Sequence, residues 1–152
     1  MSSRRWFLLA LGLILVDQLT KLVVRAVFAM GEKLPVTGFF NLTLAYNPGA
    51  AFSFLADAGG WQKFFFAALA LGISAWIAVQ LYRHPEKRLQ NLALALIMGG
   101  AIGNVIDRFA YGAVVDFLDF YIGQLHWPAF NFADSGITVG AVLLVLAEMK
   151  KT

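Results

Sequence analysis

The sequence predicts an all-α membrane protein: four transmembrane helices with a small outward-facing β segment and an interfacial loop or helix. Hydrophobic residues make up 60% of the 152-residue chain and charged residues only 14%, whereas a typical soluble domain contains about 25% charged residues. Four apolar stretches approach or exceed the length that crosses a bilayer, and the basic residues lie mostly at their ends. This composition excludes a disordered chain, a coiled coil and a small soluble enzyme.

The four apolar stretches are interpreted as one integral-membrane domain over residues 1–152. A spanning helix needs about 20 apolar residues. The last stretch, residues 132–147, has 16, so either its outer end stops inside the hydrocarbon layer or flanking residues complete the span. The first stretch follows Arg4 and Arg5 as a signal peptide would, but its length, its charged residues and the lack of a cleavage site predict a retained helix. We expect the helices at about residues 6–30, 61–82, 89–107 and 132–148.

The basic residues predict the orientation of the chain. One side of the membrane receives seven of the twelve Lys and Arg residues, whereas the other receives Lys33, Arg108 and, at its border, Lys63. Cytoplasmic segments are enriched in Lys and Arg, so we expect both termini in the cytoplasm and residues 31–60 and 108–131 on the outer side. The seven are Arg4, Arg5, Arg83, Lys87, Arg88, Lys150 and Lys151.

The outward segments carry a strand pattern and aromatic residues. Large apolar residues alternate with smaller or polar ones over residues 42–47, which is typical of a short amphipathic strand. The Asn-Pro-Gly sequence at 47–49 marks a turn, after which residues 50–52 are apolar again. Residues 117–131 include five aromatic side chains, as an interfacial belt does. We therefore expect a small aromatic sheet on the outer membrane surface.

Ionisable residues at membrane depth are costly and therefore candidates for function. Asp17 and Lys21 lie four residues apart, on one face of the first helix. We interpret them as a neutralised pair that fixes the packing of that helix.

Asp116 and Asp134 are the candidate catalytic residues, because each lies in a strongly apolar context at the outer end of neighbouring hydrophobic segments. Two carboxyl groups that meet at low dielectric share one proton, which is the state that an aspartic protease uses. The chain has no cysteine, and its two histidines lie far apart in sequence, so thiol chemistry is excluded and we expect neither metal nor cofactor.

Structural alternatives exist for each of these acids taken singly. Asp134 could cap the fourth helix, and Asp107 with Arg108 could form an ordinary ion pair. Asp116 could be a solvated loop residue. Asp119, three residues after Asp116, could take the catalytic role on a helical turn, although its position nearer the polar loop ranks it second.

Composition leaves two other function classes open. A small transporter or proton-conducting protein would use the same charges as a relay, and a non-enzymatic assembly factor would use residues 31–60 for docking. The relay predicts charges at successive depths, whereas most of those found here cluster at one outer level. Nucleic-acid binding is not indicated, because the basic residues form no patch alternating with aromatic side chains.

Five segments, in this order, resemble the bacterial lipoprotein signal peptidases, also called signal peptidase II. They extend over most of the chain, and the expected length and four-helix topology agree. Thr20 and Pro48 occupy places where that family commonly has other small residues. The segments are DQLTK at 17–21, YNPGAAF at 46–52, GNVIDR at 103–108, VVDF at 114–117 and FNFADS at 130–135.

The resemblance implies an intramembrane aspartyl endopeptidase of the bacterial cytoplasmic (inner) membrane, with its active site near the outer, periplasmic face. Its substrates would be diacylglyceryl-modified prolipoproteins, cut on the N-terminal side of the lipidated cysteine; its other partners would be membrane lipids, and we expect a monomer. The family's catalytic pair falls on Asp116 and Asp134. Its other polar active-site positions, assigned to substrate binding, fall on Asn47, Asn104, Asp107, Arg108 and Asn131.

Overall fold

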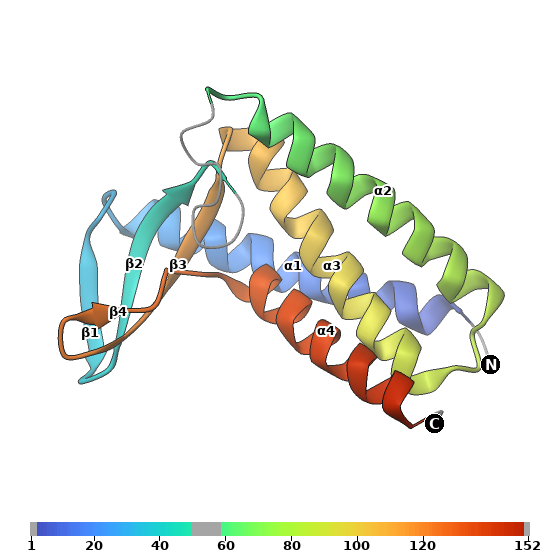
Figure 1. Ribbon diagram of the computed structural model, residues 1–152. Coiled ribbons are helices and arrows are strands. Elements are labelled where there is room, and N and C mark those ends of the chain that lie inside the picture. Colours follow the sequence, from blue (N-terminus) through green and yellow to red (C-terminus); the bar gives the residue numbers. More distant parts are fainter. Residues whose placement is uncertain (1–2, 50–58, 151–152) are drawn as a thin grey trace.

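A computed structural model describes residues 3–49 and 59–150, and in these ranges it contains four long helices and four strands (Figure 1). All four helices are long and apolar enough to cross a membrane. The helices are α1 (Arg4–Val27), α2 (Gln62–Arg83), α3 (Arg88–Tyr111) and α4 (Phe132–Met149). The strands are β1 (Lys33–Thr37), β2 (Phe40–Asn47), β3 (Val114–Ile122) and β4 (Leu125–His126).

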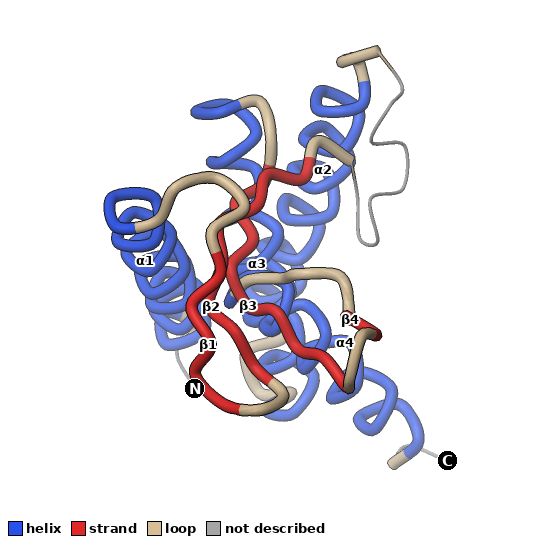
Figure 2. Tube along the Cα trace, turned by 90° about the vertical axis from the view of Figure 1, so that its left-hand side faces the viewer, coloured by secondary structure: helices blue, strands red, loops and turns tan. Residues whose placement is uncertain are grey.

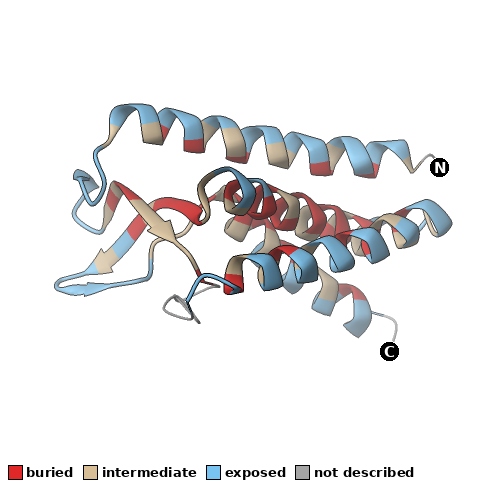
Figure 3. Cartoon of the chain, turned by 90° about the horizontal axis from the view of Figure 1, so that it is seen from above, coloured by how far each residue is buried: buried red, intermediate tan, exposed pale blue. Residues whose placement is uncertain are grey.

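Helix α3 is the centre of the helical bundle, and the buried residues concentrate there (Figure 3). Its glycines allow close approach: Gly99 lies against the backbone of Ala10 on α1, and Gly100 lies against the backbone of Ala133 on α4. By contrast, the outward faces of α1, α2 and α4 are exposed and apolar. This is the pattern of a bundle whose outer surface faces lipid.

The four strands form one antiparallel sheet in the order β1-β2-β3-β4. Figure 2 shows the sheet in front of the ends of the helices, and Figure 1 shows that it lies at the end of the bundle opposite the two ends of the described chain. Strand β2 pairs with β3, for example with Tyr46 opposite Val115. This pairing joins the two outward segments, which lie far apart in the sequence. The chain therefore passes from α3 into the sheet through β3 and β4, and then returns to the bundle as α4.

Three local expectations differ from the structure. Helix α1 ends at Val27 rather than near residue 30, and α3 continues to Tyr111 rather than stopping near 107. Gly112, with φ of 75°, then ends α3 in the left-handed conformation that glycine adopts easily. The segment expected as an interfacial loop or helix begins as strand β3, because β2 supplies its hydrogen-bonding partners.

The alternation predicted for residues 42–47 is interrupted. The register between β2 and β3 shifts between Leu42 and Ala45, and such a bulge changes which side chains face inward. Asn41 and Thr43 are consequently buried, where Asn41 donates a hydrogen bond to Asp119. Two further expectations, the apolar residues 50–52 and the basic Lys151, lie outside the described residues.

The two ends of the described chain and the connection between α2 and α3 lie at the same end of the bundle, away from the sheet (Figure 1). The basic residues Arg83, Lys87 and Arg88 belong to this connection. The arrangement is therefore the one that the positive-inside pattern requires.

The tight α3–α4 contact predicts a sensitive glycine. In Gly100→Ala, the added Cβ would collide with the carbonyl oxygen of Ala133, and overpacking of this kind costs about 1–3 kcal/mol. We expect a lower midpoint of thermal unfolding in detergent. Gly72→Ala is the matched control, because nothing lies within 4 Å of its added Cβ; equal midpoints for the two variants would contradict this packing.

Candidate active site

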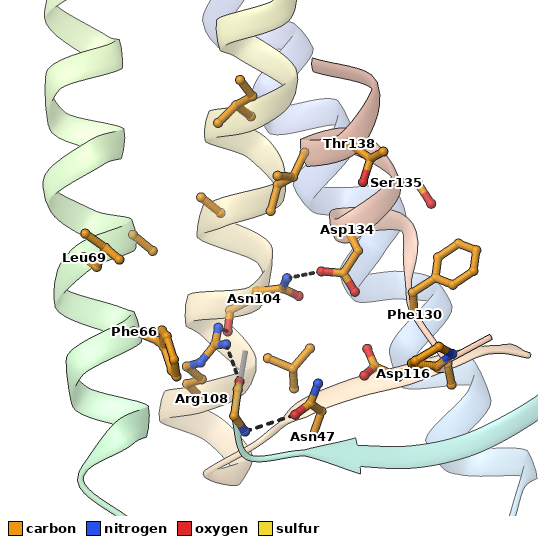
Figure 4. A pocket seen from close by; sticks show the side chains of 18 of the residues that line it. Asn47, Phe66, Leu69, Asn104, Arg108, Asp116, Phe130, Asp134, Ser135 and Thr138 are labelled. Carbon is orange, nitrogen blue, oxygen red and sulfur yellow. Dashed lines mark hydrogen bonds between the residues drawn. The ribbon is translucent and has the colours of Figure 1, made fainter. Parts of the chain in front are cut away.

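A cavity of about 670 Å³ lies between the sheet and helices α2, α3 and α4. Its charged and amide residues gather near the sheet, whereas its sides along the helices are mostly apolar, with Phe66, Leu69 and Ile73 on α2; α4 also contributes Ser135 and Thr138 (Figure 4). The polar lining consists mainly of Asn47, Asn104, Arg108, Asp116 and Asp134. We call this space the active-site cavity.

Asp116 and Asp134 both line the active-site cavity, although they come from β3 and α4 (Figure 4). Asn131 Nδ2 donates to Asp116 Oδ1 at 2.8 Å, and Asn104 Nδ2 donates to Asp134 Oδ1 at 2.8 Å. The two amides also touch, since Asn131 Nδ2 lies 3.3 Å from Asn104 Oδ1. One connected set of hydrogen bonds thus holds both carboxyl groups toward the same space.

The cap of α4 leaves the carboxyl group of Asp134 available. Asn131 is the N-cap, and its Oδ1 accepts from the backbone N–H of Asp134 at 2.8 Å. Such a cap stabilises a helix by about 1 kcal/mol. The alternative in which Asp134 itself caps the helix is therefore wrong.

Lys21 is the centre of a buried charged cluster behind the active-site cavity. Its Nζ lies 2.7 Å from Asp17 Oδ2, 2.7 Å from Asp107 Oδ2 and 3.1 Å from Asn104 Oδ1. Lys21, Asp17 and Asp107 are at most 1% exposed. Gln18 completes the cluster, because its Nε2 donates to Asp107 Oδ1 at 2.9 Å.

The charged cluster holds the backbone next to both candidate catalytic residues. Asp17 Oδ1 accepts from the N–H of Ala133, at 2.9 Å, and Asp107 Oδ2 accepts from the N–H of Val115, at 3.0 Å. Ala133 precedes Asp134, and Val115 precedes Asp116. The sequence indicated the Asp17–Lys21 pair from its spacing, but not its contacts with α3 and α4.

The structure separates the residues expected to bind substrate into two groups. Asn47, Asn104 and Arg108 line the active-site cavity. Asp107 and Asn131 have no exposed surface and lie behind it. The apolar lining from α2 and residues 127–130 is not among the expected site residues, because it contains no charged or amide side chain that would mark it in the sequence.

Arg108 fixes backbone at the border of the active-site cavity. It donates from Nη2 to Gly49 O at 3.0 Å and from Nη1 to Asn104 O at 3.2 Å. Asn47 orders the same turn, because its Oδ1 accepts from the Gly49 N–H at 3.0 Å. Asn47 also hydrogen-bonds to Asp116. The turn that follows β2 is thereby tied to the carboxyl pair.

Asp119 does not line the active-site cavity. It follows Asp116 by three residues on a strand, and residues an odd number apart point to opposite faces. Burial would raise the pKa of Asp119. Hydrogen bonds from Asn41 and His126 and the charges of Lys33 and His126 outweigh that effect and lower the pKa below its usual value. Asp119 is therefore held as a paired carboxylate away from Asp116.

The environment of Asp116 favours its protonated form. Burial, followed by repulsion from Asp134, raises the pKa of Asp116 to about 8. Hydrogen bonds from Asn131 and Asn47 and the charge of Lys21 act in the opposite direction but are weaker together. A proton held between two acids is chemistry that needs no metal; within the described ranges, no three metal-ligating side chains lie together.

Comparison with known sequences identifies close relatives. The family model described as signal peptidase (SPase) II matches residues 9–150. A lipoprotein signal peptidase of Cupriavidus taiwanensis is 58% identical over 146 residues, which cover 96% of this chain and 83% of that protein. The lipoprotein signal peptidase of Burkholderia pseudomallei (strain 668) is also 58% identical over 146 residues, covering 96% of this chain and 88% of that protein.

Two solved structures described as a bacterial membrane enzyme share the fold. One has a TM-score of 0.86 and 31% sequence identity, covering 96% of this chain and 88% of that one. The other has a TM-score of 0.83 and 31% identity, covering 97% of this chain and 94% of that one. The predicted fold class, four long apolar helices with a small sheet, is confirmed.

The charged cluster predicts that Lys21 is essential for stability. Lys21→Met leaves Asp17 and Asp107 buried without their cation, and breaking a buried pair in this way costs about 3–5 kcal/mol. We expect a strongly lowered midpoint of thermal unfolding in detergent. Lys87→Met removes an exposed ammonium group at the other end of the bundle and is expected to stay close to wild type; similar midpoints for both variants would exclude the role given to Lys21.

Proposed function

The chain belongs to the signal peptidase II family, and from this premise we propose that Asp116 and Asp134 are its catalytic pair. The protein is an aspartic peptidase that cleaves signal peptides from prolipoproteins. One observation carries the assignment of the pair: both carboxyl groups line a single, otherwise largely apolar cavity, and each is held by one of two asparagines that are hydrogen-bonded to each other.

The two acids take different roles. The raised pKa of Asp116 supports protonated Asp116 as the general acid near neutral pH. Asp134 lies in the first turn of α4, and its Oδ1 accepts a hydrogen bond from Asn104 Nδ2. With Asp116 holding the shared proton, Asp134 remains the carboxylate of the pair. Asp134 is therefore the general base.

The reaction proceeds by proton exchange between the two acids. Asp134 takes a proton from water as the water oxygen attacks the scissile carbonyl carbon, and Asp116 donates its proton to the carbonyl oxygen. In the collapse of this intermediate, Asp134 gives its proton to the leaving nitrogen and the C–N bond breaks. Asp116 then recovers a proton from a hydroxyl group of the intermediate, so that the pair returns to its starting state.

The shape of the active-site cavity suits a lipid-modified peptide. Its apolar sides along α2 and α4 accept the signal peptide and acyl chains, while Asn47 and Arg108 order its polar end. The cut falls on the N-terminal side of a diacylglyceryl-modified cysteine. Asp107 and Asn131 position the catalytic strand and helix from behind, rather than binding substrate.

The orientation follows from the charges. The end of the bundle that carries both termini and the basic α2–α3 connection faces the cytoplasm. The sheet and the active-site cavity then lie near the outer face of the bacterial inner membrane. One chain supplies the whole site, so the protein acts as a monomer. A proton relay is not favoured, because Asp17, Lys21 and Asp107 are paired with one another and with backbone.

Removal of either carboxyl group tests the catalytic pair. Asp116→Asn and Asp134→Asn keep the shape of the side chains but cannot pass the proton, so we expect cleavage of a lipidated precursor to fall by about 10²–10⁴-fold in kcat. The purified variants should unfold no earlier than wild type. Glu86→Gln, an acid removed at the opposite end of the bundle, is the matched control. Near-normal turnover by either Asn variant would refute the assignment of the catalytic pair. Equal cleavage of lipidated and unlipidated precursors would refute the substrate class.

The shared proton predicts a loss of activity in alkali. As the pH rises through about 8, Asp116 ionises and the pair loses the acid that protonates the carbonyl oxygen. We therefore expect kcat to decline above this pH, with unfolding midpoints measured at each pH to separate the effect from denaturation. A folded enzyme with a constant kcat up to a pH two units higher would contradict the role of Asp116.

A further inference from the structure

Another buried carboxylate, that of Asp119, joins three strands on the face of β3 that points away from the active-site cavity. Its Oδ2 accepts from Asn41 Nδ2 on β2 at 2.9 Å and lies 3.4 Å from Lys33 Nζ on β1. Its Oδ1 lies 2.7 Å from His126 Nδ1 on β4. Asp119 is only 4% exposed, so these contacts stand in place of solvent. None of them takes part in the proposed proton exchange.

His126 is the link between this carboxylate and the short hairpin of β3 and β4. The hairpin turns at Gly123, which has a φ of 60°. Its backbone pairing is short, with Tyr121 opposite His126 and Ile122 opposite Leu125, followed by one hydrogen bond from the Trp127 N–H to Phe120 O at 2.8 Å. The His126 ring also stacks on Tyr121, with ring centroids 5.0 Å apart. With so few backbone contacts, the Asp119–His126 contact contributes much of what holds β4 in place.

The chain that leaves His126 becomes a wall of the active-site cavity. Residues 127–130 all line the cavity, together with Asp116 and Asp134. Phe130 ends this segment, where its N–H donates to Leu118 O at 3.1 Å. The wall is thus fixed at both ends: by the backbone of Phe130 at one end, and at the other by the Trp127 N–H, which donates to Phe120 O, together with the side chain of His126.

We propose that the contact between Asp119 and His126 is a latch that positions residues 127–130 as a wall of the active-site cavity and so sets the affinity for the lipid-modified substrate. Asp119 and His126 are positioning residues, because neither lines the cavity. The inference rests on the proposed function and adds a determinant of substrate binding that lies outside the catalytic pair. It predicts an effect on KM without a matching effect on kcat.

Two substitutions separate the hydrogen bond from the aromatic ring. His126→Phe keeps a ring that stacks on Tyr121 but removes the nitrogen that meets Asp119, whereas His126→Asn loses the ring but places an amide nitrogen near the position of Nδ1. For His126→Phe we expect KM to rise about tenfold, the size of effect that one charge-assisted hydrogen bond supports, with kcat within about twofold of wild type. His126→Asn should restore most of the affinity.

The decisive experiment measures KM and kcat for a lipidated precursor alongside the environment of Trp127. Trp6, Trp61 and Trp76 are replaced by Phe, so that Trp127 is the remaining tryptophan and its quenching by acrylamide reports the position of the wall without turnover. Quenching that changes in His126→Phe but not in His126→Asn supports the latch. The latch would be overturned by unchanged quenching in both variants or by an equal loss of substrate affinity in both. A fall in kcat of His126→Phe as large as its rise in KM would also overturn it. Failure of the wild-type protein to cleave the precursor would instead refute the proposed function, and the quenching alone would then decide on the latch.

Discussion

The ammonium group of Lys21 lies 2.7 Å from a carboxylate oxygen of Asp17 and 2.7 Å from one of Asp107, in a region with almost no exposed surface. Burial of three charges is costly and is offset only when the geometry is nearly ideal and the remaining oxygens are hydrogen-bonded. Here they are: Asp17 Oδ1 accepts from the N–H of Ala133, and Asp107 Oδ1 accepts from Gln18 Nε2. The N–H of Val115 adds a bond to Asp107 Oδ2. The cluster therefore restricts how α1, α3, α4 and β3 can be arranged relative to one another.

The placement of the proposed catalytic pair follows from this restriction. Residues 116 and 134 come from different elements, and each directly follows a residue whose N–H is bound by the charged cluster. Asn104 links the charged cluster to Asp134, because its Oδ1 accepts from Lys21 Nζ while its Nδ2 donates to Asp134 Oδ1. The two acids that we propose as catalytic are thus supported by buried side chains of the charged cluster, and rigid support of this kind is what precise proton transfer requires.

Local sequence patterns predicted the parts of the fold that depend on local physics. Apolar stretches located the four helices, and acids in apolar surroundings located Asp116 and Asp134. The pairing of β2 with β3 was not predictable, because strands about 70 residues apart leave no local mark of their register, and the bulge at residues 42–45 buries polar side chains that alternation would expose. The partners of Lys21 likewise depend on how α1 packs against α3. Residues 127–130 belong to the active-site cavity only because β4 turns them back toward it.

We propose that Asp116 and Asp134 hold one proton between them at neutral pH. Infrared spectroscopy of the folded protein in detergent tests this most directly, because a protonated carboxyl group has a C=O stretching band distinct from that of a carboxylate. For wild type at neutral pH we expect a protonated-carboxyl band, which disappears as the pH rises through about 8. The Asp116→Asn variant should lack this band. A spectrum at neutral pH that is unchanged in this band by Asp116→Asn would contradict it.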